Sequence, residues 1–417
     1  MPEQIAYKTK RNVALLALSQ AALITGSSLL LASSAVVGLA LAGQKSLATL
    51  PLALLFLAQM TTTIPASLYM AKVGRRLGFM TSSMFGMTGA AIATAGVFRS
   101  DFSIFCTGTA LIGVFNGFGQ YYRFTAAEVA SDTYRSRAIS YVLAGGVIAA
   151  FAGPNLANWS RHVLPPDFGG SYACLIGLYL LAFGFASLLR IPKPALIVIS
   201  QGGRPLSGIA RQPAYLVAVA SAMVGYGVMN FIMVATPLAM KGYAHAFSDT
   251  AFVIQWHVFG MFVPSFFTGH LIRRFGTANI MISGILMLGF CVWINLTGTT
   301  VIHFWAALFL LGLGWNFLFV GATSLLTETY APAEKAKAQA LNDFLVFGTV
   351  TFTSFSSGAI QQFLGWQTIN VAVLPFLVLM AIANLWLRHK PQLEAAAGGP
   401  NRVIHPEPQK AADVKSS

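Results

Sequence analysis

The sequence predicts an all-α membrane protein with twelve transmembrane helices in two pseudo-symmetric six-helix bundles. Of its 417 residues, 56% are hydrophobic and only 9% are charged, whereas a soluble domain has roughly 25% charged residues. Apolar stretches of roughly 20 residues recur from Val13 to Leu387, and each is long enough to cross a hydrocarbon core of about 30 Å. The basic residues lie in short clusters between these stretches.

Charged, Gly-rich and Pro-rich breaks separate the expected spans. With a cytoplasmic N-terminus, all but four of the 26 lysines and arginines fall on the cytoplasmic side, as the positive-inside rule requires. The exceptions are Lys45, Arg99, Arg161 and Lys241. We therefore expect a multi-pass protein of a cell inner membrane with both termini cytoplasmic. The expected spans are 13–40, 48–70, 78–98, 102–125, 137–157, 170–190, 213–238, 250–271, 277–297, 301–327, 338–362 and 367–387.

The formal net charge of +14 does not predict a nucleic-acid partner, because the basic residues follow membrane topology and form no continuous basic face. The three cysteines all lie inside apolar stretches, at spacings that suggest neither a metal site nor a disulfide framework. The first apolar stretch lacks a clear signal-peptide cleavage site. We expect no cofactor and no metal, with the lipid bilayer and a small-molecule substrate as partners of a monomer.

The chain divides into two halves that resemble each other at an offset of about 200 residues. We expect a cytoplasmic N-terminus (1–11), a first bundle (12–190), a cytoplasmic linker (191–212), a second bundle (213–390) and a disordered cytoplasmic tail (391–417). Parallel six-span repeats of this kind are typical of secondary transporters. The matching pairs are Phe115-Asn116 with Trp315-Asn316, Glu128 with Glu328, Arg135 with Lys335, and Arg137-Ala138 with Lys337-Ala338.

Two loop motifs and their repeats resemble the major facilitator superfamily over about residues 12–390. Residues 67–76 (SLYMAKVGRR) are similar to the family's G-x-x-x-D-R-x-G-R-R signature between its second and third spans, and residues 269–276 (GHLIRRFG) repeat it. Residues 128–135 and 328–335 match an E-x6-R pattern that the family places after spans 4 and 10. Gly145 with Gly153-Pro154 resembles a reduced form of a fifth-span signature often seen in exporters.

The loop motifs suggest a gate at the cytoplasmic ends of the spans. A glycine permits a tight turn between spans, and neighbouring cations can pair with glutamates when that side closes. The signature's aspartate is Ala71 in the first half and Arg273 in the second, and its first glycine is Ser67, so the sequence departs here from the family's aspartate-anchored pattern. The alternative is that the loop cations only set topology. The expected gate residues are Gly74, Arg75, Arg76, Glu128, Arg135, Gly276, Arg274, Glu328 and Lys335.

The resemblance implies that spans 1, 4, 7 and 10 line a central cavity, which gives the polar residues of these spans a meaning. Buried amides and an arginine are costly in lipid and usually face a cavity or another helix. The alternatives are interhelical hydrogen bonding for the amides, snorkelling for the arginine and packing for the tyrosine. Amides beside aromatic rings suit a neutral or mildly anionic organic solute. The expected cavity residues are Gln20, Asn116, Gln120, Arg123, Tyr226, Asn230, Trp315 and Asn316.

No carboxylate lies at the centre of an expected span, so other groups must be considered for proton coupling. His257 is embedded in the eighth span, and an imidazole can change charge near physiological pH. The alternative is a neutral histidine that bonds to a neighbouring helix. Asp343, beside Asn342 at the start of the eleventh span, is the second candidate, and the proton is the coupling ion that both would carry.

These observations favour a secondary transporter that moves a small organic solute by alternating access. The fifth-span signature leans toward export, while the missing central carboxylate leans toward facilitated or exchange transport. A membrane-embedded enzyme is the first alternative, although the seven histidines are scattered and no H-E-x-x-H motif occurs. A channel or a non-transporting sensor is the second. The absence of a G-x-x-x-x-G-K-[ST] motif disfavours an ATP-driven pump.

Overall fold

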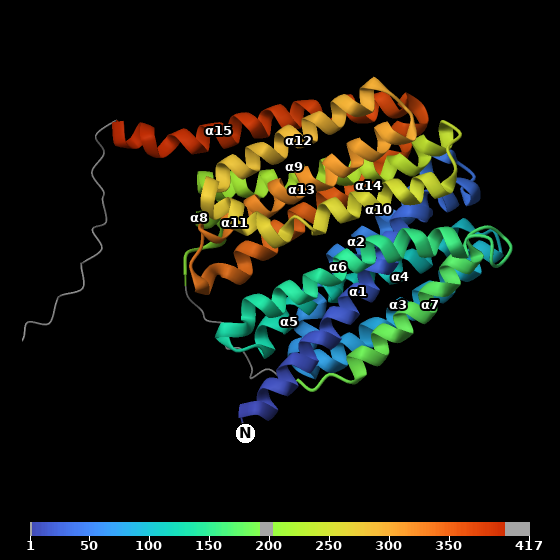
Figure 1. Ribbon diagram of the computed structural model, residues 1–417, viewed down its shortest axis with the longest axis horizontal. Helices are drawn as coiled ribbons and strands as arrows, with labels where there is room; N and C mark the ends of the chain where they lie inside the picture. Colours follow the sequence, from blue (N-terminus) through green and yellow to red (C-terminus); the bar gives the residue numbers. More distant parts are fainter. Residues whose placement is uncertain (1, 192–202, 397–417) are drawn as a thin grey trace, which may run out of the picture.

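The computed structural model describes residues 2–191 and 203–396, and every regular element in these ranges is helical. Figure 1 shows two groups of long helices, α1–α7 and α9–α15, lying side by side. The first half holds α1 (Pro2–Leu41), η1 (Lys45–Leu47), α2 (Leu50–Val73), α3 (Arg75–Phe98), α4 (Phe102–Gly119), α5 (Tyr122–Val129), α6 (Asp132–Ser160) and α7 (Gly169–Ser187). After α8 (Leu206–Ala210), the second half holds α9 (Pro213–Gly242), α10 (Phe247–Phe262), α11 (Ser265–Phe275), α12 (Thr277–Thr297), α13 (Val301–Thr327), η2 (Pro332–Glu334), α14 (Lys335–Val371) and α15 (Leu374–Ala396).

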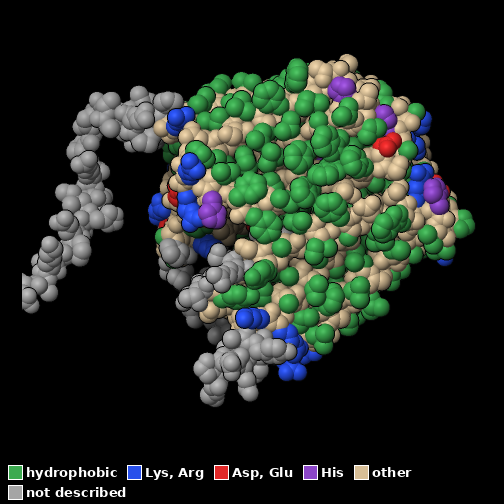
Figure 2. Space-filling view, in the orientation of Figure 1, with side chains coloured by type: hydrophobic (Ala, Val, Ile, Leu, Met, Phe, Trp, Pro, Cys, Tyr) green, Lys and Arg blue, Asp and Glu red, His purple; other side chains and the backbone are tan. Residues whose placement is uncertain are grey.

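Equivalent helices pack in the same way in both halves. In the first half α1 packs on α6 and α3 packs on α4, while in the second α9 packs on α14 and α12 packs on α13. Between the halves, α2 contacts α14 and α6 contacts α10. Large apolar side chains cover the outer surface of both halves (Figure 2), as expected for helices that face lipid.

Nine helical segments of the described chain are long and apolar enough to span a membrane, and the bent pair α10–α11 brings the number to ten. One of the nine, Lys337–Arg388, is 52 residues long and contains both α14 and α15, whereas one span needs only about 20 residues. The 24-residue α3 is not among the nine, because small and polar residues dilute its hydropathy. Two of these, Gly86 and Gly89, let α3 contact Phe115 and the α4 backbone closely. The number of spans becomes twelve if α3 is counted and if α14 and α15 are counted as separate spans. Twelve spans therefore remain a prediction.

Several boundaries differ from the expected ones. The fourth span is broken between α4 and α5, and the eighth bends by 45° between α10 and α11, where Pro264 lacks the N–H that would continue the helix. The break expected at 361–366 is a kink at Gly365 (φ 79°) inside α14. The last span starts later than expected, at Leu374, and α15 continues to Ala396, so residues 391–396 are helical and do not belong to a disordered tail. The rest of that tail, 397–417, lies outside the described residues.

The two signature loops adopt the same backbone conformation at the same end of the molecule. Gly74 links α2 to α3 with φ 94° and ψ 158°, and Gly276 links α11 to α12 with φ 84° and ψ 150°. A positive φ is readily adopted only by glycine, so the predicted turn role of both glycines is confirmed. We call this end, which carries Lys72, Arg75, Arg76, Arg273 and Arg274, the basic face, and the opposite end the far face.

The described end of the linker is attached to the second half through Glu334. Both the backbone N–H and the side chain of Arg204 donate to this carboxylate, at 2.6 Å and 2.8–3.0 Å, and the N–H of Ala331 donates at 3.0 Å. These hydrogen bonds, led by the Arg204 side chain, lower the pKa of Glu334 to about 2. Glu334 therefore stays ionised at physiological pH, and the linker from Gly203 onward stays bound to the loop before α14.

Candidate functional site

A cavity of about 210 Å³ lies between the two halves. Its walls come from α1, α2, α4 and α5 on one side and from α9, α10 and α13 on the other. All the expected cavity residues except Asn316 line it, namely Gln20, Asn116, Gln120, Arg123, Tyr226, Asn230 and Trp315. The spans that the resemblance implied therefore do meet at one pocket, with α2 and α10 as additional walls.

The first half supplies a polar wall made of Gln20, Ser27, Gln59, Asn116 and Gln120. The amide of Asn116 donates to Ser27 Oγ at 3.2 Å, which joins α4 to α1 at the cavity. These uncharged groups offer both hydrogen-bond donors and acceptors. Neither of two lining residues, Ser27 and Gln59, was predicted from the sequence. Gln59 belongs to the second span, which was not expected to line the cavity.

The second half supplies an aromatic wall made of Tyr226, Trp315 and Phe319. The rings of Trp315 and Phe319 stack with their centroids 5.1 Å apart and an interplanar angle of 10°. The Tyr226 ring stands edge-on to both at 5.3 Å. Such offset and edge-to-face arrangements hold rings rigidly and present a large apolar surface. Phe319 was missed, although it lies one helical turn after Trp315 on the same face of α13.

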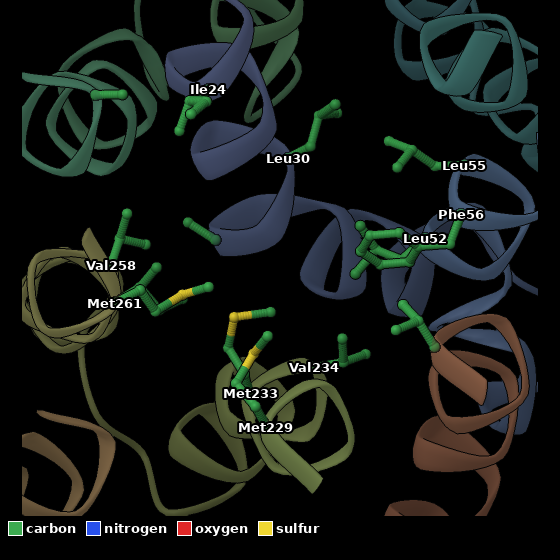
Figure 3. Packing of buried hydrophobic residues seen from close by; sticks show 14 of the residues in the cluster. Ile24, Leu30, Leu52, Leu55, Phe56, Met229, Met233, Val234, Val258 and Met261 are labelled. Atoms are coloured by element: carbon green, nitrogen blue, oxygen red, sulfur yellow. The ribbon is translucent and has the colours of Figure 1, made fainter. Parts of the chain in front are cut away.

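Three methionine side chains form a flexible part of the cavity lining. Met229 and Met233 of α9 and Met261 of α10 line it, and Figure 3 shows their thioether side chains extending into the space between α9, α10 and α1. Methionine is flexible and polarisable, so such a surface can fit an irregular apolar ligand. Asn230 is fixed beside them, since its amide donates to Ser354 Oγ at 2.7 Å and to Thr353 Oγ1 at 3.0 Å.

Arg123 is the only charged residue among the described residues that line the cavity. The Arg123 side chain lies between the two halves. It is exposed to solvent because it faces the open end of the cavity. The guanidinium lies 4.9 Å from the Phe124 ring centre, and it interacts electrostatically with Tyr226 and Asp343 of the other half. Figure 2 shows a recess bordered by Lys and Arg side chains at this end of the molecule. The cavity thus has a positively charged mouth on the basic face.

The far face is closed by contacts between the halves. The N–H of Gly358 donates to Thr49 Oγ1 at 3.1 Å, and the Asn155 amide donates to Gln255 Oε1 at 2.6 Å. Nearby, Ala35, Ala48 and Leu238 form a small buried apolar cluster. A cavity that is closed at one face and reached from the other is the geometry of one end state of a two-state carrier.

Asn316 does not line the cavity, which contradicts its expected role. It is fully buried, and its amide donates to Met261 O at 2.7 Å and to Ser265 Oγ at 2.6 Å, while Thr268 Oγ1 donates to its Oδ1 at 2.7 Å. Met261 lies just before the break between α10 and α11, where the proline leaves carbonyls without their helical partners. Asn316 therefore holds the bend of the eighth span, which is the interhelical hydrogen-bonding alternative.

This difference between the repeated asparagines predicts opposite outcomes for two matched variants. Asn316→Ala removes the amide that bonds to the Met261 carbonyl and the Ser265 hydroxyl, while Thr268 Oγ1 can still donate to Pro264 O at 2.8 Å. We therefore expect a loss of about 1–3 kcal/mol of stability, read as a lower thermal unfolding temperature in detergent. Asn116→Ala removes a cavity group that bonds only to Ser27 among the described residues, so it is expected to raise the KM for substrate with little change in unfolding temperature. Equal effects of both variants on both measurements would contradict this assignment.

His257 lies outside the cavity. It is fully buried between α10 and α13, and its Nδ1 is 2.8 Å from the carbonyl oxygen of Leu308. This contact favours the alternative in which a neutral imidazole bonds to a neighbouring helix. Asp343, by contrast, lies close enough to the cavity mouth to interact with Arg123, and it accepts a hydrogen bond from Asn342 at 3.0 Å. Neither coupling candidate lines the cavity, but Asp343 interacts electrostatically with Arg123, which does.

The expected gate pairs are asymmetric. In the first half Arg75 forms a bidentate pair with Glu128, at 2.5 Å and 3.0 Å, which joins α3 to α5 within that half. The Arg75–Glu128 pair is already formed in this structure, in which the basic face is open. The pair therefore does not form only when that face closes. In the second half Thr277 occupies the place of Arg75, and Glu328 is exposed to solvent.

The remaining gate residues add no pairing at the second loop. Arg274 lies over the ring of Phe275, at 5.3 Å from its centre, and not beside Glu328. Arg76 and Lys335 are exposed on the basic face. The side chain of Arg135 lies outside the described part of the chain.

Comparison with known proteins agrees with this architecture. The family model of the Major Facilitator Superfamily matches residues 217–412. The riboflavin transporter RfnT of Brucella anthropi is 41% identical over 394 residues, which is 94% of this chain and 99% of that protein. The uncharacterised MFS-type transporter YdeG of Bacillus subtilis is 26% identical over 363 residues, covering 83% of this chain and 84% of that protein.

Solved structures share the fold. A nucleoside transporter, NupG, superposes with a TM-score of 0.69 at 13% identity, covering 90% of this chain and 99% of that one. An auto-inhibited peptide transporter of the POT family superposes with a TM-score of 0.64 at 12% identity, covering 95% of this chain and 99% of that one. With the duplicated halves and the close relative, these likenesses lead to one conclusion. The chain belongs to the major facilitator superfamily, and it is a membrane transporter and not an enzyme.

Proposed function

We propose that this protein is a secondary transporter of riboflavin that works by alternating access. The observation that carries the proposal is the 41% identity to a riboflavin transporter over nearly the whole length of both chains. Identity at this level over 94% of this chain and 99% of that relative supports a shared substrate more strongly than the fold does, because one fold hosts many substrates.

The chemistry of the cavity supports the proposal. Riboflavin joins a flat tricyclic ring, whose edge carries carbonyls and an N–H group, to a chain of hydroxyls. The aromatic wall of Tyr226, Trp315 and Phe319 offers a surface for the ring. The amides and hydroxyl of the polar wall can bond to both the hydroxyl chain and the ring edge. The expectation of a neutral or mildly anionic organic solute includes this molecule.

The distribution of charge supports an orientation in the membrane. Because the basic face gathers the loop cations, we place it in the cytoplasm of a cell with an inner membrane. The structure would then be the state in which the cavity faces the cytoplasm. We propose that the protein acts as a monomer and that Asp343, beside Arg123, is the group to test first for proton coupling.

Counterflow in proteoliposomes tests the function directly. Vesicles loaded with unlabelled riboflavin are expected to accumulate labelled riboflavin transiently, because a carrier exchanges one molecule for another across the membrane. Recovery of chemically unchanged riboflavin excludes an enzyme, and a channel would give no counterflow. An imposed pH gradient that leaves the exchange rate unchanged but drives net accumulation would identify the proton as the coupling ion. Vesicles that exchange no flavin would contradict the proposed function.

A further inference from the structure

We propose that Arg123 binds the carbonyl edge of the flavin ring, so that the ring lies at the cavity mouth and the hydroxyl chain points toward the far face. The inference rests on the proposed function and goes beyond it, since it assigns an orientation to the ligand. It follows from the positions of the charge, the rings and the uncharged polar groups along the cavity axis. Arg123 then becomes a residue that determines which flavins are accepted.

The aromatic wall and the charge line the same small cavity. Arg123 and Tyr226 both belong to its lining, and the charge of Arg123 acts on the Tyr226 hydroxyl. Phe319, the member of this wall nearest to the end of α13, also lies toward the basic face. A flat ring that stacks on this wall therefore has one edge within reach of Arg123. Its carbonyl oxygens are acceptors that a guanidinium can bind with two N–H groups.

The deeper part of the cavity suits hydroxyls and not charge. Asn116 lies in α4, before the break that separates α4 from α5, and is therefore nearer to the far face than Arg123 of α5. Ser27 lies beside it, bonded at 3.2 Å, and Gln59 of α2 is also part of the lining. Apolar side chains, including Phe56 and Met233, also line the cavity. No cation is found there among the described lining residues, so an anion at this depth would lose its hydration without a partner.

The two possible orientations therefore predict opposite selectivity for a phosphorylated flavin. With the hydroxyl chain deep, a phosphate at the end of that chain is placed among uncharged groups and is excluded. With the hydroxyl chain at the mouth, the same phosphate would pair with Arg123 and bind better than the free hydroxyl. Flavin mononucleotide, which is riboflavin with this one phosphate, distinguishes the two orientations.

The experiment is competition against counterflow of labelled riboflavin, with flavin mononucleotide and lumichrome as probes. Lumichrome retains the ring and its carbonyl edge but lacks the hydroxyl chain. For the unchanged protein we expect lumichrome to compete and flavin mononucleotide to compete at least 100-fold more weakly than riboflavin. Flavin mononucleotide that competes as well as riboflavin would overturn the orientation, while riboflavin counterflow would still support the proposed function.

Variants of Arg123 provide the second readout. A charge-assisted hydrogen bond is typically worth enough to change binding about tenfold or more, so Arg123→Gln should weaken riboflavin and lumichrome by the same factor of roughly 10. Arg123→Lys, which keeps the charge but loses the planar fork, should restore part of the affinity. Arg211→Gln is the control, since it removes an exposed basic-face cation outside the cavity. Unchanged lumichrome competition in Arg123→Gln would overturn the proposal, and wild-type thermal unfolding of the variant excludes a folding defect.

Discussion

Replacement of Phe247 by alanine is expected to open the far face, and a cysteine placed at Leu238 should then react about tenfold faster with a membrane-impermeant maleimide. Phe247 begins α10 in the second half, and its ring meets that of Phe168 from the first half at 4.9 Å and 81°. Both side chains are buried. Arg161 lies over both rings, 5.1 Å and 5.4 Å from their centres. This cluster bridges the two halves at the face that must open for the other end state.

The size of the effect follows from the contacts that are lost. An aromatic pair adds about 0.5–1.5 kcal/mol beyond its buried area, and a cation over a ring adds about 0.5–2 kcal/mol. These contacts stabilise only the state with the closed far face, so their loss shifts the equilibrium between states by the same free energy. A shift of about 1.4 kcal/mol changes that equilibrium tenfold.

Asp167 holds Arg161 in this position. It accepts from the guanidinium at 2.9 Å and 3.2 Å, and its other oxygen is 3.0 Å from His162 Nδ1. Partial burial raises the pKa of Asp167, but the hydrogen bonds from Arg161 and His162 together outweigh this effect. The pKa of Asp167 therefore lies below its usual range. The Asp167–Arg161 ion pair is therefore fully formed when the pH is above the usual pKa of an aspartate. It is lost only as the pH falls through the lowered pKa.

The control for this prediction is Phe252→Ala in the same cysteine background. Phe252 lies on the same helix, but it is 44% exposed, and its ring contacts that of Trp256 within α10 itself. The three native cysteines are first replaced by serine or alanine, since Cys174 is only partly buried. Leu238 is 8% exposed in the closed structure, so a cysteine there reports opening. Equal labelling rates in the Phe247 and Phe252 variants would show that the aromatic cluster does not hold the far face closed.

The general architecture could be predicted because membranes impose simple rules on sequence. Spans must be apolar and long, and cations gather on one side, so the helices and their direction follow from the sequence pattern. The duplication was visible in matched motifs, and the structure confirms the turns at Gly74 and Gly276 with nearly equal dihedral angles. Boundaries were less accurate where a kink replaces a loop, as at Gly365, because no charge or proline marks the turn.

The site was only partly predictable, because equal sequence positions can have different neighbours. Asn116 and Asn316 each follow an aromatic residue in equivalent spans, yet only Asn116 lines the cavity. The difference comes from Ser265 and Thr268, which reach Asn316 because the second half bends before them. Glu334 lies between the expected spans 301–327 and 338–362, and its binding of Arg204 joins residues far apart in the chain. Contacts of this kind leave no local pattern in a sequence.

Substitution of Gly113 is expected to have the largest effect on folding, because this glycine lets α4 touch α2 at backbone distance. A Cβ at Gly113 would collide with the carbonyl oxygen of Leu55 and lie 2.9 Å from Ala58 Cβ. The second half repeats the arrangement, since a Cβ at Gly312 of α13 would collide with the carbonyl oxygen of His257 in α10. Small residues at helix contacts are a general means of close packing in membranes, where apolar surfaces gain little from association alone.

Gly113→Val should therefore destabilise the protein by about 1–3 kcal/mol or more, because neither backbone can move without separating the other helices of the bundle. The matched control is Gly289→Val in α12, a helical glycine with open space where a Cβ would be placed. The measurement is the fraction of detergent-solubilised protein that stays monodisperse on heating. Because Asn116 lies on α4 and Gln120 directly follows its last residue, both within two turns of Gly113, the same displacement would move the polar wall, so surviving Gly113→Val protein should also lose transport. If both glycine variants unfold at the same temperature, the close α2–α4 contact does not support the cavity as the structure indicates.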